Sequence, residues 1–292
     1  MKYDLTQARK CIETLDKRRF DRALLGSGDA FRHIVSLVPL LLHLNHPALP
    51  GYVEDAPAGI ADFILSNYQQ NFLSKEYPEL VEDVQSAVNS DAVFAPILGI
   101  YVMGSFGSIS QTSASDLDIW ICHQDDLSEQ DQQRLAEKTK KISQWASTFH
   151  VEMHFYLMTQ KRFRNERYSD PLTKENSGSA QYMLLLEEFY RSAVRLSGKP
   201  LLWLHLWVED EKQYEAEVSR LVEAGELDPN DWVDFGGLGQ FSASEYFGAS
   251  LWQLYKGIDS PYKSVMKILL LETYAQEYPN AHLIARQFKE DL

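Results

Sequence analysis

Cysteine is nearly absent from this sequence, which contains only Cys11 and Cys122 among its 292 residues. Two cysteines cannot build a disulfide framework, and so few thiols suit a reducing compartment. The first twenty residues carry charges throughout and lack the apolar stretch of a secretory signal. We therefore expect a cytoplasmic protein.

Long hydrophobic runs are also missing. The longest apolar stretch, residues 34–44, is interrupted by Ser36, Pro39 and His43. It is shorter than the ~20 apolar residues that a helix needs to cross a bilayer. We therefore expect no membrane span.

Positive charge is scarce, since 28 Lys and Arg residues stand against 42 Asp and Glu residues, a formal net charge of -14. Binding nucleic acid through the overall field requires clustered basic side chains, so we expect no nucleic-acid partner. The lysines at 138, 140 and 141 are predicted to form a solvated helix face. Hydrophobic residues make up 45% of the chain, which is typical of a folded globular protein.

Hydrophobic periodicity predicts an α+β fold in three parts. The spacing of apolar residues predicts helices over 4–25, 29–44, part of 63–88, 127–149 and 181–196. Strands are predicted over 97–103, 117–122, 150–158 and 201–208, and turn residues predict loops over 46–59 and 165–179. We expect an N-terminal helical segment (1–91), a core with a mixed sheet (92–210), and a C-terminal helical segment (211–292) that closes a cleft.

Two helix starts are marked in the C-terminal segment. Ser242 with Glu245 three residues later is the pattern of a capping box. Ser260 precedes Pro261, which suits the first position of a helix. The last residues, RQFKEDL, are still charged and helical in pattern, so we expect a piece of a longer protein.

The residues that indicate chemistry lie between 103 and 120, in MGSFGSISQTSASDLDIW. Side chains alternate along a strand, so Asp116 and Asp118 share one face. Neighbouring carboxylates repel each other unless a cation neutralises them, and oxygen ligands favour Mg²⁺ or Mn²⁺. Gly104 and Ser105 permit close backbone approach to a phosphate and supply donors for its oxygens. The pattern predicts metal-assisted attack on a nucleotide phosphorus, with two ions ~3.5–4 Å apart.

A third acid is expected from the strand predicted over 150–158. Glu152 alternates with the core residues Val151 and Met153 and shares its face with His154 and Tyr156. An acid within an apolar strand needs a reason, and metal ligation supplies one. The alternative is a glutamate that faces solvent on an edge strand.

Two roles are possible for each of the other candidate nucleotide-binding residues. Trp120 shares the strand face of Asp116 and Asp118, so it either stacks on a base or packs in the core. A lysine in the first turn of a helix opposes the dipole unless an anion binds there. Triphosphate contacts are therefore predicted for Tyr262, Lys263 and, more weakly, Lys267, with ordinary solvated side chains as the alternative.

Three further features receive less weight. His43 and His46 lack a third ligand and are expected to cap or pack. Cys122 lacks a partner that would make it a nucleophile. The loop over 165–179 is predicted to be mobile, and a lid over the nucleotide is the alternative.

The order of Gly-Ser, a polar gap and Asp-hydrophobic-Asp resembles the signature of the DNA polymerase β-like nucleotidyltransferase superfamily. Two longer blocks, RALLGSGDAFRHIVSLVPLLLHLNHPALPGY and EYFGASLWQLYKGIDSPYKSVMKILLLETY, resemble the N-terminal catalytic region of class I adenylate cyclases of the enterobacterial type. The resemblance implies conversion of ATP to 3′,5′-cyclic AMP and pyrophosphate with Mg²⁺. It also implies a C-terminal regulatory region, absent here, that answers to the sugar phosphotransferase system.

The resemblance assigns roles to individual residues. It implies that Asp116 and Asp118 are the metal-binding pair and that Gly104 and Ser105 form the phosphate-binding turn. Ser115 stands where its hydroxyl would contact a phosphate. Glu152 takes the position of the third acid, where many superfamily members carry Asp. Two other functions stay open: a nucleotidyltransferase that adenylylates a separate acceptor, and a non-catalytic nucleotide-binding module.

Overall fold

The computed structural model describes residues 5–82, 84, 95–112, 115–165, 182–258 and 260–292. At its centre lies a sheet of four strands: β1 (Ile97–Met103), β2 (Leu117–His123), β3 (Met153–Met158) and β4 (Val194–Gly198). The strand order is β3-β2-β1-β4. Strand β1 runs antiparallel to β2 and β4, whereas β2 and β3 are parallel. The sheet is mixed, and the predicted α+β class is confirmed.

One face of the sheet packs against α2 (Asp29–His43), α3 (Asn67–Glu76) and α5 (Glu129–Ser147). Alternate residues of the central strands, including Ile100, Val102, Ile119 and Ile121, are buried with the leucines of α2. Parallel strands require a crossover connection, and α5 supplies it between β2 and β3. A short 3₁₀ helix (Pro78–Leu80) follows α3.

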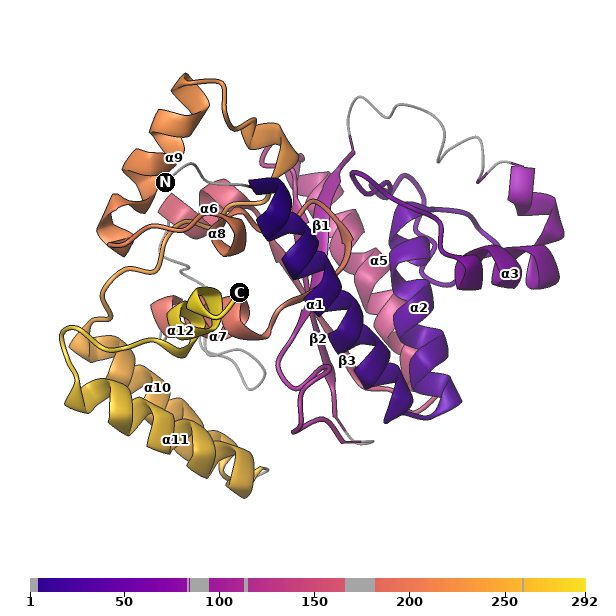
Figure 1. Cartoon of the computed structure of the whole chain (residues 1–292). Helices are drawn as coiled ribbons and strands as arrows, with labels where there is room; N and C mark the ends of the chain where they lie inside the picture. The colour runs from indigo at the N-terminus through magenta and orange to yellow at the C-terminus, as the bar shows by residue number, and fades with distance from the viewer. Residues whose placement is uncertain (1–4, 83, 85–94, 113–114, 166–181, 259) are drawn as a thin grey trace.

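The opposite face, which carries Tyr101, Trp120 and Cys122, packs against a second helical layer. This layer contains α6 (Gln160–Asn165), α7 (Tyr182–Ser192), α8 (Leu202–His205), α9 (Tyr214–Glu223) and α12 (Ile284–Glu290), with 3₁₀ turns at Glu211–Gln213 and Pro229–Asp231. Helix α1 (Leu5–Leu25) contacts α8 and the edge strand β4. Helices α10 (Ala243–Lys256) and α11 (Pro261–Gln276) form a hairpin outside α7 (Figure 1).

Most predicted elements are present, and two are wrong. The helix predicted over 181–196 ends at Ser192, and Val194–Gly198 is the edge strand β4. The strand predicted over 201–208 is instead helix α8, preceded by a single bridge between Leu201 and Val233. Nearly every residue of that stretch is apolar, so its pattern favours neither period. The predicted loop over 165–179 lies, from residue 166 onward, outside the described residues, as do 85–88.

The C-terminal part is less helical than predicted. Residues 234–242 contain no regular element, although α10 and α11 begin where Ser242 and Pro261 predict. Ser242 Oγ accepts a hydrogen bond from Glu245 N (3.3 Å), which is the first half of the predicted capping box. The Glu245 carboxylate reaches α7, where Oε2 accepts from Met183 N (2.7 Å). This contact ties the hairpin to α7.

Apolar side chains from both sides of residue 210 share one core. Tyr190 and Trp203 are buried in the same cluster as Tyr214 and Phe235. The division into 1–91, 92–210 and 211–292 therefore stays a prediction. Within the described residues, every helix is either too short or too polar to cross a bilayer.

Of the three lysines of α5 predicted to form a solvated face, Lys140 and Lys141 are exposed, but Lys138 is not. Lys138 is buried, and Nζ donates to Leu44 O (2.9 Å), Asn45 Oδ1 (3.2 Å) and Gly51 O (3.5 Å). The expectation was wrong for Lys138 because the loop after α2 folds over this side of α5, while Lys140 stays exposed. His43 and His46 have the predicted local roles. His43 Nδ1 accepts from Ile60 N, and His46 Nδ1 accepts from Ala48 N.

Candidate active site

Asp118 lies on β2, directly beside Met103 of β1 and His154 of β3. Its carboxylate faces the turn that follows β1, since a Cβ placed on Gly104 would be 3.8 Å from Asp118 Oδ2. Gly104 has φ +86°, a conformation that residues with a side chain rarely adopt. Tyr156 OH donates to the other oxygen, Asp118 Oδ1 (3.3 Å). The acid and the Gly-Ser turn are therefore neighbours, as predicted.

The electrostatic surroundings of Asp118 suit a cation. Burial raises the pKa of Asp118, and the negative charge of Asp116 raises it further. His154 and Lys263 act in the opposite direction but do not reverse the shift. A carboxylate with a raised pKa beside a second acid is stabilised in its charged form when a positive charge approaches.

The turn after β1 uses several of its own polar groups. Gly104 N donates to Ser192 Oγ (3.1 Å), and Ser108 Oγ donates to Ser105 O (2.7 Å). Ser115 Oγ accepts from Thr112 N (2.9 Å). The Gly104 amide is already used, whereas the Ser115 hydroxyl accepts from Thr112 N and can still donate to a phosphate oxygen.

The same turn rests on α1. A Cβ on Gly107 would overlap the Arg19 carbonyl oxygen, so only glycine fits there. Gln111 Nε2 donates to Ala23 O (3.2 Å) and Ser27 Oγ (2.9 Å). Arg19 also donates from its guanidinium to the carbonyls at the end of α7, Ser192 O and Ala193 O. Helix α1 thus contacts both the turn and the end of α7, whose Ser192 binds the turn.

Glu152 lies just before β3, one residue earlier than the strand begins. Leu117 N donates to Glu152 O (3.0 Å), which places Glu152 beside Asp116. Its side chain is 74% exposed, and Oε1 lies 3.1 Å from His154 Nε2. Among the residues that the structure describes, no three His, Cys, Asp or Glu side chains are grouped to hold a metal ion. The third-acid role therefore stays a prediction, and it requires Glu152 to turn away from His154.

A lysine–glutamate pair connects α11 to α7 next to these acids. Lys267 Nζ lies 2.8 Å from Glu188 Oε1 and 3.0 Å from Oε2. Burial opposes the charged form of Glu188, but Lys267, Arg191 and Lys263 outweigh it and lower the pKa of Glu188 to about 2. Lys263 is exposed one turn earlier on α11, and Tyr262 is exposed at the helix start. Lys263 lies near enough to Asp118 to lower its pKa, and Lys267 is held by Glu188; among the printed contacts of the described residues, none joins Tyr262 to the acids.

Trp120 is not placed to stack on a base. Its side chain is 2% exposed, and its ring stacks on Phe189 with centroids 4.1 Å apart and an interplanar angle of 13°. The prediction was wrong because α7 covers this face of β2 at Trp120. The alternative, a packing tryptophan, is what the structure shows.

Three residues of the site are missing from the predicted set: Tyr156, Glu188 and Ser192. Tyr156 lies on the same strand face as Glu152, and that pattern points to it. Glu188 follows Glu187 within the apolar helix YMLLLEEFYRS, and acids in such a helix require partners. Ser192 gives no comparable signal, because its contact with Gly104 joins residues 88 positions apart.

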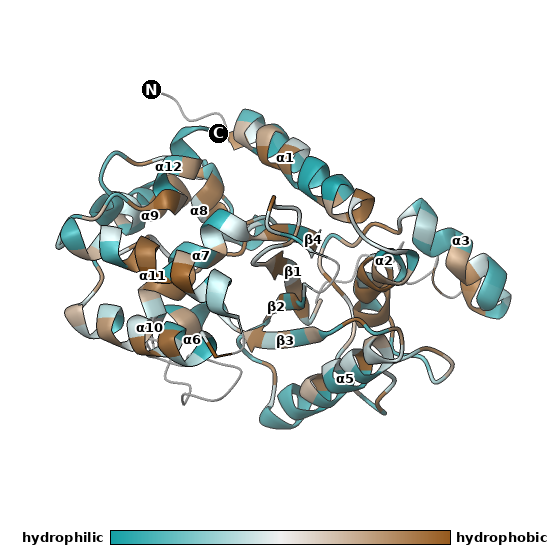
Figure 2. Ribbon diagram, turned by 90° about the horizontal axis from the view of Figure 1, so that it is seen from below, coloured by the Kyte–Doolittle hydropathy of each residue, from teal (hydrophilic) through white to brown (hydrophobic). Residues whose placement is uncertain are grey.

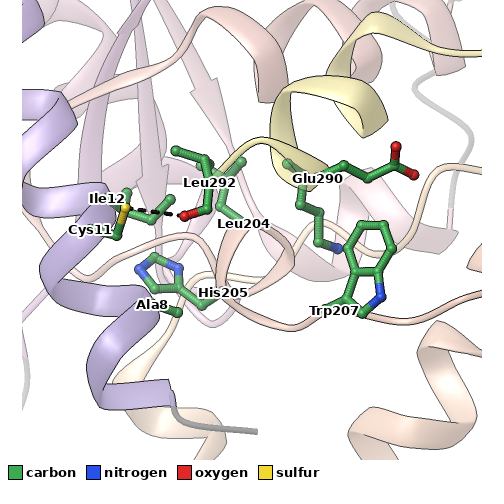
Figure 3. A pocket seen from close by; sticks show the side chains of 9 residues that line it. Ala8, Cys11, Ile12, Leu204, His205, Trp207, Glu290 and Leu292 are labelled. Carbon is green, nitrogen blue, oxygen red and sulfur yellow. Dashed lines mark hydrogen bonds between the residues drawn. The ribbon is translucent and has the colours of Figure 1, made fainter.

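A cavity of about 340 Å³ lies elsewhere, between α1, α8 and α12. Its lining includes Ile12, Leu204, His205 and Trp207, and none of the predicted site residues (Figure 3). Cys11 Sγ donates to Leu292 O (3.3 Å) across it. The acids and the cavity are therefore separate features.

The structure therefore has a mixed sheet in which the turn at Gly104, directly after β1, faces Asp118 of the neighbouring strand β2. The family profile described as "Adenylate cyclase NT domain" matches residues 4–204, and that described as "Adenylate cyclase, class-I, second domain" matches residues 241–292. The chain belongs to the class I adenylate cyclase family.

Curated relatives agree with this assignment. The chain is 68% identical to an adenylate cyclase of Haemophilus influenzae and 63% identical to one of Pasteurella multocida, each time over 100% of this chain and 35% of the relative. It is 45% identical to an adenylate cyclase of Escherichia coli, over 96% of this chain and 33% of the relative. The chain thus spans about a third of the length of these relatives.

Among solved structures, a spectinomycin adenyltransferase from Enterococcus faecialis, crystallised with ATP and spectinomycin, is similar with a TM-score of 0.30 and 11% identity. The match covers 77% of this chain and 98% of that one.

Proposed function

We propose that this chain is the catalytic region of a class I adenylate cyclase, which converts ATP to 3′,5′-cyclic AMP and pyrophosphate. The observation that supports it best is the half-buried Asp118 carboxylate, which lies beside Asp116 and faces the glycine turn at Gly104. The curated relatives are named adenylate cyclases, and the family profiles cover both ends of the chain. The activity is carried over from proteins about three times as long.

The donor set suits a hard divalent cation. Two carboxylates close enough to raise a pKa by repulsion are oxygen ligands of the kind that Mg²⁺ and Mn²⁺ prefer. Asp116 and Asp118 would hold the metal, with Glu152 as the third acid, and two ions are expected. When bound, the metal supplies a lowered pKa for the ribose 3′-OH and neutralises phosphate charge.

The chain's own residues would bind and orient the nucleotide. The turn at Gly104 and Ser105 would take phosphate oxygens, and Lys263 and Lys267 would stabilise the charge that builds up on pyrophosphate. Tyr156, which donates to Asp118 Oδ1, keeps Oδ2 directed at the turn. Attacking hydroxyl and α-phosphorus belong to one molecule, so holding ATP in a bent pose brings the reacting atoms together.

The greater length of the curated relatives supports the proposal that this region forms part of a larger protein. By its family resemblance, the full-length protein is expected to be cytoplasmic and to carry a C-terminal regulatory region that responds to the sugar phosphotransferase system.

The substitution Asp118→Asn tests the proposal. We expect full-length protein incubated with ATP and Mg²⁺ or Mn²⁺, without any acceptor, to form cyclic AMP. Asp118→Asn should lower kcat by at least about 10²-fold, the size of effect typical for losing one charge-stabilising group in an active site. Asp126→Asn, an exposed aspartate just after β2, is the matched control and should leave kcat unchanged.

Two results would contradict the proposal. One is unchanged turnover in Asp118→Asn, measured by chromatography of the nucleotide products. The other is transfer of AMP to a protein or small molecule with no cyclic nucleotide under either metal, which would favour the adenylylating alternative.

A further inference from the structure

The outer side of α10 carries an apolar stripe that nothing in the described part of the structure covers. Phe247, Leu251 and Leu254 follow the spacing of a single helix face, and Ile258 lies in the turn just after the helix. Their exposed fractions lie between 64% and 78%. The buried residues Ala249 and Trp252 lie on the opposite side of the helix.

Helix α11 repeats this arrangement. Val265, Met266 and Leu269 are between 51% and 68% exposed. The opposite side of α11 carries Lys267, which binds Glu188 of α7, and the buried Leu271 and Tyr274. Hydrophobic residues therefore occupy both helices of the hairpin in Figure 2, yet only one side of the hairpin is packed.

So many exposed apolar side chains are unusual for a helical hairpin that has no further binding partner. The cluster that attaches the hairpin to α7 has only five buried members, among them Leu184, Ala249 and Leu271. More large apolar side chains of α10 and α11 point outward than inward in the described residues. Exposed apolar patches of this kind mark surfaces that bind another protein segment.

Two observations identify the occupant. The profile of the second adenylate cyclase domain matches residues 241–292, which contain the whole hairpin, and this chain covers only 35% of the length of the relative from Haemophilus influenzae. The net charge of -14 makes two copies of the chain repel each other, which disfavours a second copy as the occupant. The rest of a longer protein is therefore the favoured occupant of this face.

We propose that the outer face of α10 and α11 is the docking surface for the chain that follows residue 292 in the full-length protein. The occupant is an apolar segment of that chain. The hairpin then has two packed sides, one on α7 beside the candidate site and one on the remainder of the protein. This inference does not depend on the proposed reaction.

Thiol labelling of the full-length protein tests the docking surface. In a Cys11→Ser background, which removes the exposed thiol of residues 1–292, Leu251→Cys should react with a maleimide at least 10-fold more slowly than Ile64→Cys when labelling is measured on the peptide that carries each position. Ile64 is the matched control because it is 83% exposed on a loop before α3, far along the chain from the hairpin. Equal labelling rates at the two positions would overturn the proposal.

Two further measurements fix the identity of the occupant. Adding Leu254→Arg should restore rapid labelling at Leu251→Cys, whereas Ile64→Arg should not. Protection that disappears on dilution would show that a second copy covers the face, which contradicts the proposal. Labelling rates do not require cyclase activity, so failure of this proposal and failure of the proposed function are separate results.

Discussion

At the scale of single residues, Gly104 has both a structural role after β1 and a proposed role in binding phosphate. It ends β1, adopts φ +86°, and leaves open the space next to Asp118 Oδ2 that a side chain would enter. Its amide is held by Ser192, so the position of the turn is fixed from α7 as well as from β1. The backbone conformation favours glycine, and a Cβ there would fit but would take up space beside the carboxylate.

Replacing Gly104 and a control glycine distinguishes the effect of the positive φ from the effect of filling the space beside Asp118. Gly104→Ala should lower the free energy of unfolding by about 1 kcal/mol through its positive φ and should also lower kcat/KM. Gly225→Ala is the matched control, because Gly225 has φ +68° and a Cβ added there would meet no described atom within 4 Å. It should show the stability loss alone in urea unfolding and cyclic AMP assays. Equal loss of activity in both variants would remove Gly104 from the site.

Lys138 shows how a charged residue becomes structural. Burial lowers its pKa to about 8, against an ordinary value of 10.5. Three oxygens of the loop after α2 surround its ammonium group. Between pH 8 and 10.5 the unfolded chain therefore holds a proton that the folded chain has released, and the free energy of unfolding rises with pH.

Lys138→Met should remove this rise. The wild-type protein is expected to gain stability from Lys138 above pH 8, by up to ~1.4 kcal/mol per pH unit, relative to the variant. At pH 7 the variant should be less stable by about 1–3 kcal/mol, because buried oxygens lose their donor. Urea unfolding from pH 7 to 10 measures both effects, with Lys140→Met on the exposed side as control. Parallel pH profiles for wild type and Lys138→Met would contradict the assignment.

At the scale of elements, α7 is the junction of the C-terminal helices. The buried carboxylate of Glu187 accepts from Tyr274 OH of α11 (3.0 Å) and from Ala285 N of α12 (3.0 Å) on Oε1. Its Oε2 accepts from Arg191 Nε of α7 itself (3.0 Å). One side chain thus holds three helices together.

Glu187→Ala should loosen α11 and α12 together. We expect a loss of about 2–4 kcal/mol, since a buried hydrogen-bonded acid is removed and its donors stay behind. Amide hydrogen exchange should accelerate in α11 and α12 more than in β1 and β2. Glu272→Ala, on the exposed side of α11, serves as control and should change neither quantity. Uniform acceleration across the sheet would show that Glu187 acts on the whole fold instead.

The accuracy of the predicted elements follows from their patterns. Strands β1 and β2 were predicted almost to the residue, because an apolar run and a strict alternation are both unambiguous at that length. Strand β4 was missed because Val194 and Leu196 continue the helical spacing of α7. What ends that helix is tertiary: Val194 pairs with Val102 of β1. Such pairing is invisible to local periodicity.

At the scale of the whole molecule, two hydrophobic cores lie on opposite faces of one sheet. The core under α7 is built from residues on both sides of position 210, including Tyr190, Trp203, Val233 and Phe235. A region that ends at residue 210 would therefore lack some of the buried side chains of this core.

Truncation tests this view of the core. A chain ending at residue 210 should lose cooperative unfolding and bind hydrophobic dyes, because Tyr214, Trp232 and Phe235 no longer cover the sheet. The chain of 292 residues is the control. A sharp thermal transition with near-ultraviolet circular dichroism in the shorter chain would instead support the division at 210.

The candidate site was predictable only where it is local in sequence. Asp118 and Gly104 lie within one short stretch, so spacing sufficed to place them together. Glu188 and Ser192 reach the same place through α7, and Lys267 through α11. Those contacts depend on how helices pack, which the order of residues along one element does not determine.

The turn after β1 takes its rigidity from a helix that ends about eighty residues before it. Gln111 bonds to Ala23, 88 positions earlier, and Gly107 lies flush against the Arg19 carbonyl. A stretch rich in serine and glycine would by itself adopt many conformations, and these contacts with helix α1 restrict it. A change in the position of α1 would therefore change the shape of this turn without any contact with Asp116 or Asp118. An antibody or peptide that binds α1 is expected to act on the candidate site in this indirect way.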